Sequence, residues 1–202
     1  FSIVAVISVL WICCEGLNFL YYKEDELTRI MWKNFYEESS ERGIDNIIIG
    51  SSHVYCDINP YVLDEINGEN NFNLSAPNLR LNAAYYMLKE ANRKNNIQNV
   101  YIELFHVLCT GKTGDVNYSS SLLENWRVVS YMRPSWNKMT YIYDINEKGN
   151  QKYVETILPF LRYKKYVFDK EFIKNNMEIK ISDNFRNYMY TKENENEKIV
   201  LK

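Results

Sequence analysis

The stretch Asn46-Ile-Ile-Ile-Gly50-Ser51-Ser52-His53 joins an apolar run to a small, polar turn. Three β-branched residues between Asp45 and Gly50 predict a short buried strand. The small residues that follow it let the backbone turn sharply and leave a hydroxyl exposed. Open α/β sheets place their active sites at such carboxyl ends of strands. A plain strand-to-loop turn is the other interpretation of Gly-Ser-Ser taken by itself.

The segments around this turn alternate between strand and helix. Asn59 can cap a helix that Pro60 begins, and Gly68 can end it, so the turn is expected to lead into that helix. Strands alternating with helices predict an α/β fold with a parallel sheet, right-handed crossovers and helices on both faces. The expected segments are strands at 46–49, 71–76 and 99–104, with helices at 60–67, 79–94 and, farther along, 170–176.

Three of these segments together resemble a known family. The runs IIIGSSHVYCDINP at 47–60, NFNLSAPN at 71–78 and VYIEL at 100–104 are similar to the amino-terminal half of an SGNH (GDSL-type) hydrolase. The similarity is greatest to its membrane-anchored bacterial branch, which includes proteins of teichoic-acid D-alanylation and of exopolysaccharide acetylation. The resemblance implies a three-layer α/β/α, flavodoxin-like fold.

The resemblance also implies site residues. The last Ser of the family's first block is the nucleophile, which corresponds to Ser52. The second block, Asn-x-Gly, supplies a backbone N–H to the oxyanion and corresponds to Asn73 and Ser75. Serine in place of glycine retains that amide donor while narrowing the allowed backbone angles. The third block, Gly-x-Asn-Asp, is replaced here by Glu103-Leu-Phe-His106, so its oxyanion-binding Asn has no counterpart.

A serine hydroxyl needs a base to take its proton, and the chain has two histidines. His53 follows Ser52 directly, so we expect it in a loop or lining the substrate pocket and disfavour it as the base. His106 comes at the end of the third strand and could approach Ser52, oriented by Glu103 or Asp115. A triad so assembled would be new for the family.

The family's usual base comes from an Asp-x-x-His block near the carboxyl terminus. No such block occurs between Ser182 and Lys202. We therefore expect the base and its Asp beyond Lys202, so that residues 1–202 form an amino-terminal fragment with little activity of its own.

The amino-terminal end is an apolar run that lacks an initiating Met. Residues 1–14 are shorter than the ~20 apolar residues that span a bilayer, and a few preceding residues would complete a span. No A-x-A-like cleavage site follows, which favours a signal anchor over a cleaved signal peptide, with a buried core helix as the alternative. The expected organisation is a partial membrane anchor at 1–22 and an SGNH-like domain at 23–202, truncated at its carboxyl end. That domain would lie outside the cytoplasm on a single-pass anchor in the cell membrane.

Composition limits the possible ligands. The net charge of −2 offers no basic surface for nucleic acid. The four cysteines lack the spacing and the histidine partners of a zinc site, so neither a metal nor a cofactor is expected. Trp126 and Arg127, with nearby aromatics, could form a sugar-binding wall, although core packing is the more frequent fate of such residues.

The sequence thus predicts an extracytoplasmic serine esterase or O-acyltransferase. It would act on acyl groups of a cell-surface glycan through an acyl-Ser52 intermediate. The alternative is a catalytically degenerate SGNH-like module that binds glycan or assembles with a membrane-bound acyltransferase. A nucleotide-binding domain is disfavoured, because Gly50-Ser51-Ser52 matches neither G-x-G-x-x-G nor G-x-x-x-x-G-K-[ST].

Overall fold

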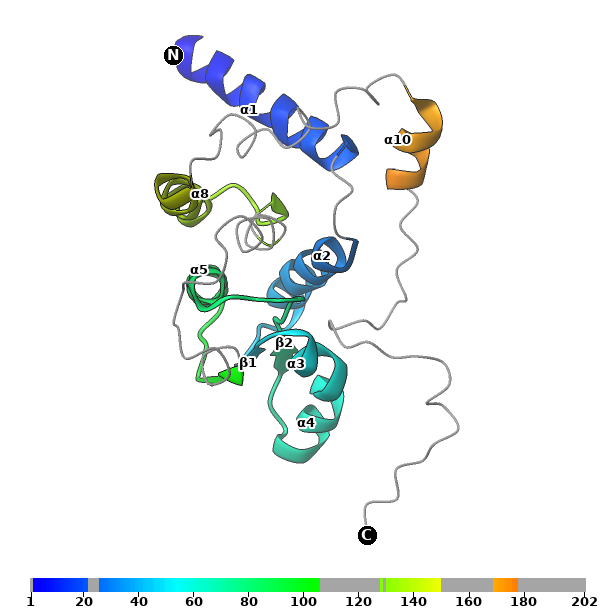
Figure 1. The fold of residues 1–202 in the computed structure, drawn as a ribbon, viewed down its shortest axis with the longest axis vertical. Coiled ribbons are helices and arrows are strands. Elements are labelled where there is room, and N and C mark those ends of the chain that lie inside the picture. The colour runs from blue at the N-terminus through cyan, green and yellow to red at the C-terminus, as the bar shows by residue number, and fades with distance from the viewer. Residues whose placement is uncertain (1, 22–25, 106–127, 129, 150–168, 178–202) are drawn as a thin grey trace. The chain divides into compact units, whose positions relative to one another are not determined.

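The computed structural model of the chain describes residues 2–21, 26–105, 128, 130–149 and 169–177 (Figure 1). The chain divides into two compact units. Unit 1 comprises Phe1–Glu26 and Tyr118–Lys180, and unit 2 comprises Leu27–Asn117 and Ile181–Lys202. The Gly-Ser-Ser turn lies in unit 2, and the domain boundary expected near residue 22 stays a prediction.

Unit 2 contains a three-stranded parallel sheet in the order β2-β1-β3. The strands are β1 at Asn46–Ile49, β2 at Asn71–Asn73 and β3 at Asn99–Ile102. β1 is central and pairs in parallel with both neighbours. The mixed α/β class and the parallel sheet are therefore confirmed. All carboxyl ends of a parallel sheet meet at one edge, so the turn after β1 lies where residues following β2 and β3 can reach it.

Coverage of the sheet differs between its strands. Ile47, Ile48 and Ile49 of β1 are all buried. Because successive strand residues point to opposite faces, both faces of β1 are covered. Every residue of β3, by contrast, is exposed. The expectation of helices on both faces of the whole sheet stays a prediction, since burial alone does not identify the covering elements.

Four helices accompany the sheet among the described residues of this part of the chain. They are α2 at Glu26–Glu41, α3 at Ser52–Asp57, α4 at Pro60–Asn67 and α5 at Leu81–Lys94. The predicted helix after Asn59 is confirmed, because the Asn59 side chain accepts a hydrogen bond from Tyr61 N at 3.0 Å. Gly68 ends this helix in the left-handed region, with φ 71°.

The expectation that this helix directly follows the turn was wrong. The short helix α3 comes first and begins at Ser52 itself. Its six residues are too few to show a helical period in the sequence. Ser52 therefore lies in the first turn of a helix and not in an open loop.

Helix α2 supplies much of the core and was not predicted. Met31, Trp32, Phe35 and Tyr36 are buried, at i, i+1, i+4 and i+5 on one face. The Phe35 ring meets the Phe72 ring of β2 edge-on, with centroids 5.6 Å apart. This contact seats α2 on the sheet.

A buried polar contact joins α2 to α5. The Tyr36 hydroxyl donates to Glu90 Oε1 at 3.1 Å. Arg93 neutralises the same carboxylate through Nη2 at 2.5 Å and Nε at 3.0 Å. The pairing with Glu90 raises the pKa of the Arg93 guanidinium. Glu90 can therefore be buried because its charge and its lone pairs are satisfied.

A row of asparagines crosses the amino edge of the sheet. Asn46 faces Asn71 on one side and Asn99 on the other in the strand register. Asn99 Nδ2 donates to Asn46 Oδ1 at 2.9 Å, and Asn46 Nδ2 donates to Asn71 Oδ1 at 3.0 Å. Asn71 Nδ2 continues the row to Asp64 Oδ1 at 2.9 Å. We call these three side chains the asparagine ladder.

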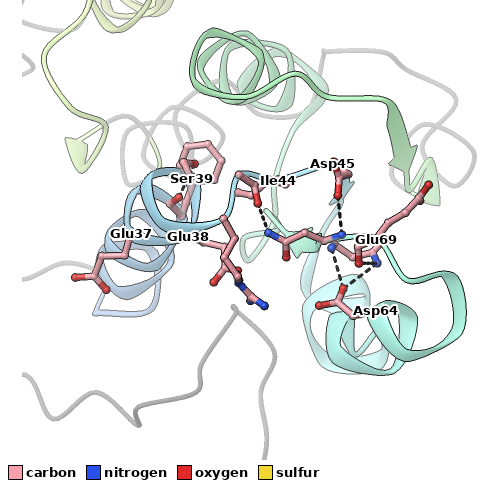
Figure 2. A network of polar contacts seen from close by, with 12 residues as sticks. Glu37, Glu38, Ser39, Ile44, Asp45, Asp64 and Glu69 are labelled. Atoms are coloured by element: carbon pink, nitrogen blue, oxygen red, sulfur yellow. Dashed lines mark hydrogen bonds and ion pairs between the residues drawn. The ribbon is translucent and has the colours of Figure 1, made fainter.

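Carboxylates flank the asparagine ladder, and Figure 2 shows Asp45, Asp64 and Glu69 beside one another at this edge. Glu69 Oε2 accepts from Asn46 Nδ2 at 2.7 Å. Asp45 Oδ2 accepts from Asn70 N at 2.9 Å. The amino edge of the sheet is thus held by side-chain hydrogen bonds, which leaves the carboxyl edge for a site.

The described helices of the other unit include α1 at Ser2–Tyr21, α8 at Trp136–Gly149 and α10 at Lys170–Met177. The prediction of a helix at 170–176 is confirmed. Helix α1 covers the apolar run, and its exposed side chains include Val6, Ile7, Val9, Leu10 and Ile12. Within the described ranges, no helix has both the length and the apolar character needed to cross a membrane. The anchor predicted over 1–22 is therefore not supported as a span.

Candidate functional site

The Gly-Ser-Ser turn places two hydroxyls in different environments. Ser51 is the N-cap of α3, with φ −84° and ψ −162°, and is 1 % exposed. Ser52 is the first helical residue and is partly exposed. Within the described part of the chain, no hydrogen bond engages the Ser52 hydroxyl. Of the two serines, Ser52 is the more exposed residue.

Gly50 permits the close approach of three segments at this turn. A Cβ on Gly50 would lie 2.3 Å from Val54 Cγ2 of α3. It would also lie 2.6 Å from the Cβ of Glu103, the residue after β3. Real Cβ atoms do not come so close to other atoms, so only glycine fits here.

Glu103 binds the backbone of the turn. Its Oε2 accepts the Ser51 N–H at 2.6 Å, a charge-assisted hydrogen bond. Its own N–H donates to Ile49 O at 3.0 Å, which extends the β1–β3 ladder by one residue. From the sequence, we expected Glu103 only to orient His106, and we did not predict its contact with the Ser51 amide. The position of Glu103 directly after β3, which pairs with β1, was the one sequence feature that could have indicated this contact.

His53 folds back over the turn. Its Nδ1 lies 3.0 Å from Ser51 Oγ and 3.4 Å from Glu103 Oε1. Its ring packs against Phe105, with centroids 4.6 Å apart. A catalytic triad engages the serine with one ring nitrogen and the acid with the other. Here both groups meet Nδ1, so Ser51, His53 and Glu103 do not form a triad.

Asn73 supports α3 from the neighbouring strand. It is buried, and its Nδ2 donates to Val54 O at 3.0 Å and to Ile58 O at 3.1 Å. The first carbonyl lies in α3 and also accepts the Ile58 N–H at 3.0 Å, and the second belongs to the carboxyl cap of the helix. Asn73 thereby ties the helix that carries Ser52 to β2. A direct contact between Asn73 and substrate stays a prediction.

Ser75 lies beside the turn. Leu74 N donates to Ile48 O at 2.7 Å, and Ala76 N donates to Gly50 O at 3.2 Å. Residues 74–76 therefore run alongside residues 48–50, past the end of β2. This brings the Ser75 backbone to the segment that precedes Ser52. Its role as an oxyanion donor stays a prediction.

The other predicted site residues, His106, Trp126 and Arg127, lie outside the described residues, as does Asp115. The structure thus brings Ser52, His53, Asn73 and Ser75 to one edge of one sheet. No family model matches the chain, and searches of curated proteins and of solved structures found no match either.

Proposed function

We propose that this protein is an extracytoplasmic serine esterase or O-acyltransferase acting on acyl groups of a cell-surface glycan. One observation carries the proposal: the partly exposed residue Ser52 begins a helix and is separated by two residues from the end of the central strand of a parallel sheet. This is the position from which open α/β sheets perform chemistry. The protein would have an SGNH-type three-layer domain and an amino-terminal membrane anchor, and it would be located in the cell membrane.

In the proposed reaction the Ser52 oxygen attacks the acyl carbonyl. The bond between carbonyl carbon and leaving-group oxygen breaks, and a base passes the serine proton to that oxygen. Water or a glycan hydroxyl then releases the acyl group from Ser52. The Ser52 amide would bind the oxyanion, such a donor being worth roughly 3 kcal/mol in the transition state. The Ser75 amide lies between two amides that face the β1 segment, so it would have to turn toward Ser52 to act as the second donor. The candidate base within this sequence is His106, which lies outside the described residues.

A second candidate function is a non-catalytic module that binds glycan or assembles with a membrane-bound acyltransferase. It is favoured by the engagement of His53 Nδ1 with Ser51 and Glu103. Among the described residues, no histidine hydrogen-bonds to Ser52. In this alternative the same contacts serve only to shape the turn.

The test uses the full-length protein with p-nitrophenyl acetate and with a fluorophosphonate that labels activated serines. We expect the label on the peptide that contains Ser52. Ser52→Ala should lower kcat by roughly 10⁴-fold or more, the usual cost of losing a serine nucleophile. Reaction rates and mass spectrometry of the labelled peptide provide the readouts.

Ser51→Ala is the matched control. It removes a neighbouring hydroxyl that is buried and bonded to His53, so it should weaken hydrolysis without abolishing it. Label on Ser51, or Ser52→Ala activity equal to that of the wild type, would refute Ser52 as the nucleophile. Absence of both label and turnover, with glycan binding retained, would favour the non-catalytic module.

A further inference from the structure

The site contains two exposed rings that the proposed chemistry has not used. His53 and Phe105 pack together beside Ser52, at the carboxyl ends of β1 and β3. The His53 side chain is 55 % exposed, and Phe105 is 44 % exposed. An exposed aromatic face next to a reactive hydroxyl offers an apolar surface on which a sugar ring can lie.

Contacts with the turn and with Phe105 fix the orientation of the His53 ring. Nδ1 meets Ser51 Oγ and the Glu103 carboxylate, and the Phe105 ring supports the ring plane. Within the described residues, no hydrogen bond engages Nε2. A neutral imidazole has one donor and one acceptor nitrogen, so Nε2 is the nitrogen left for a ligand.

Glu103 fixes this arrangement through separate oxygens. Oε2 holds the Ser51 N–H at 2.6 Å, and Oε1 faces His53 Nδ1 at 3.4 Å. The carboxylate is largely shielded, with its side chain 17 % exposed. One side chain therefore couples the backbone of the nucleophile turn to the direction of the His53 ring.

From this geometry we propose that His53 and Phe105 form the subsite for the acyl acceptor, a sugar whose hydroxyl hydrogen-bonds to His53 Nε2. Glu103 is the positioning residue that orients the His53 ring for this contact. This inference rests on the proposed function, because the acceptor is the group that takes the acyl from Ser52. It assigns a ligand class to residues that otherwise only shape the turn.

The activity experiment measures how the acyl group is divided between the sugar acceptor and water. Full-length protein receives p-nitrophenyl acetate as donor and methyl β-D-glucopyranoside as acceptor, and the ratio of acetylated sugar to free acetate is measured. His53→Ala, Phe105→Leu and Glu103→Gln should each lower this ratio by about fivefold or more, the equivalent of one lost contact of ~1 kcal/mol. A fold defect alone would lower both products together and leave the ratio unchanged.

Tyr85→Leu is the matched control for Phe105→Leu. Tyr85 is an aromatic residue of α5 with 56 % exposure, packed against Tyr86. Its loss should leave the ratio at the wild-type value. An unchanged ratio in the His53 and Phe105 variants, or hydrolysis by the wild type without any transfer to the sugar, would overturn the acceptor subsite.

An NMR experiment tests sugar binding at His53 independently of the proposed catalytic activity. The chain has two histidines, so the His106→Gln variant identifies the ring signals of His53 in an NMR spectrum. The sugar should shift these signals in the wild type and in Ser52→Ala, but not in Phe105→Leu. Glu103→Gln should move them before any sugar is added. If they stay in place in Glu103→Gln, the positioning role is refuted, whether or not the protein turns over ester.

Discussion

At the scale of single residues, Gly50 is a position with no room for a side chain. A Cβ there would come within 2.3–2.7 Å of Val54 and Glu103, so one of these segments would have to move. We expect Gly50→Ala to lower the free energy of unfolding by about 1–3 kcal/mol, the usual cost of overpacking. Urea denaturation measures the change.

The control for this prediction is Gly16→Ala. Gly16 lies inside α1 with nothing within 4 Å of the added methyl, so alanine should be neutral or slightly stabilising there. A Gly50→Ala protein as stable as the wild type would contradict the close packing of the turn.

Tyr61 of α4 gives a prediction on pH. Burial raises the pKa of the Tyr61 phenol to about 12 from 10.0, and the nearby Glu38 carboxylate adds to the effect. An acid with a raised pKa in the folded state favours folding through its neutral form. That contribution is complete below pH 10 and is lost as the pH rises toward 12.

Tyr61→Phe should therefore flatten the loss of stability between these pH values. The measurement is the difference in urea midpoint between wild type and variant across the alkaline range. Identical pH dependence in the two proteins would show that the Tyr61 phenol titrates normally.

At the scale of elements, the asparagine ladder sets the register of the sheet. Asn46 is fully buried and donates to Glu69 and Asn71. Asn46→Asp would replace that donor with a buried carboxylate facing acceptors, at a cost of about 2 kcal/mol or more. Urea denaturation at neutral pH tests this expectation.

Asn67→Asp is a control within the same network. Asn67 is exposed, and an aspartate there keeps the oxygen that accepts from Glu69 N and Asn71 Nδ2. It loses the Nδ2 donor, whose contacts with Glu69 Oε2 at 3.3 Å and Asn71 Oδ1 at 3.4 Å are long and can be replaced by water. The change should cost less than about 1 kcal/mol, as for most surface substitutions. Equal losses in the two variants would mean that the ladder does not depend on the uncharged amide of Asn46.

Elements with local signals were predictable from the sequence. Three consecutive isoleucines before Gly50 marked β1, and the Asn59-Pro60 pair marked the start of α4. Helix α2 was passed over, although the spacing of Met31, Trp32 and Phe35 carried a helical signal. Such spacing alone does not say where a helix packs.

The site was predictable only in outline. The resemblance singled out Ser52, Asn73 and Ser75, and the parallel strands that precede them end at one edge of the sheet. The engagement of Glu103 with the Ser51 amide depends on how three segments pack around Gly50. No local pattern encodes a contact between residues 52 positions apart.

At the scale of the whole molecule, the proposal of a membrane anchor makes a prediction about topology. Helix α1 exposes a row of apolar side chains that includes Val6, Leu10 and Ile12. We expect the full-length protein to sediment with membranes and to be digested when intact cells are treated with protease. Protection of the protein while a known surface protein is digested would refute the extracytoplasmic location.

The exposed strand β3 affects the tendency of the protein to aggregate. Val100, Tyr101 and Ile102 are about half exposed, and among the described strands only β1 pairs with β3. An apolar strand with an open edge is a template for strands of other molecules, so it favours aggregation at high concentration. Natural proteins protect such strands with charged side chains, of which the exposed residues of β3 have none. Tyr101→Lys should therefore lengthen the time that a concentrated solution stays clear.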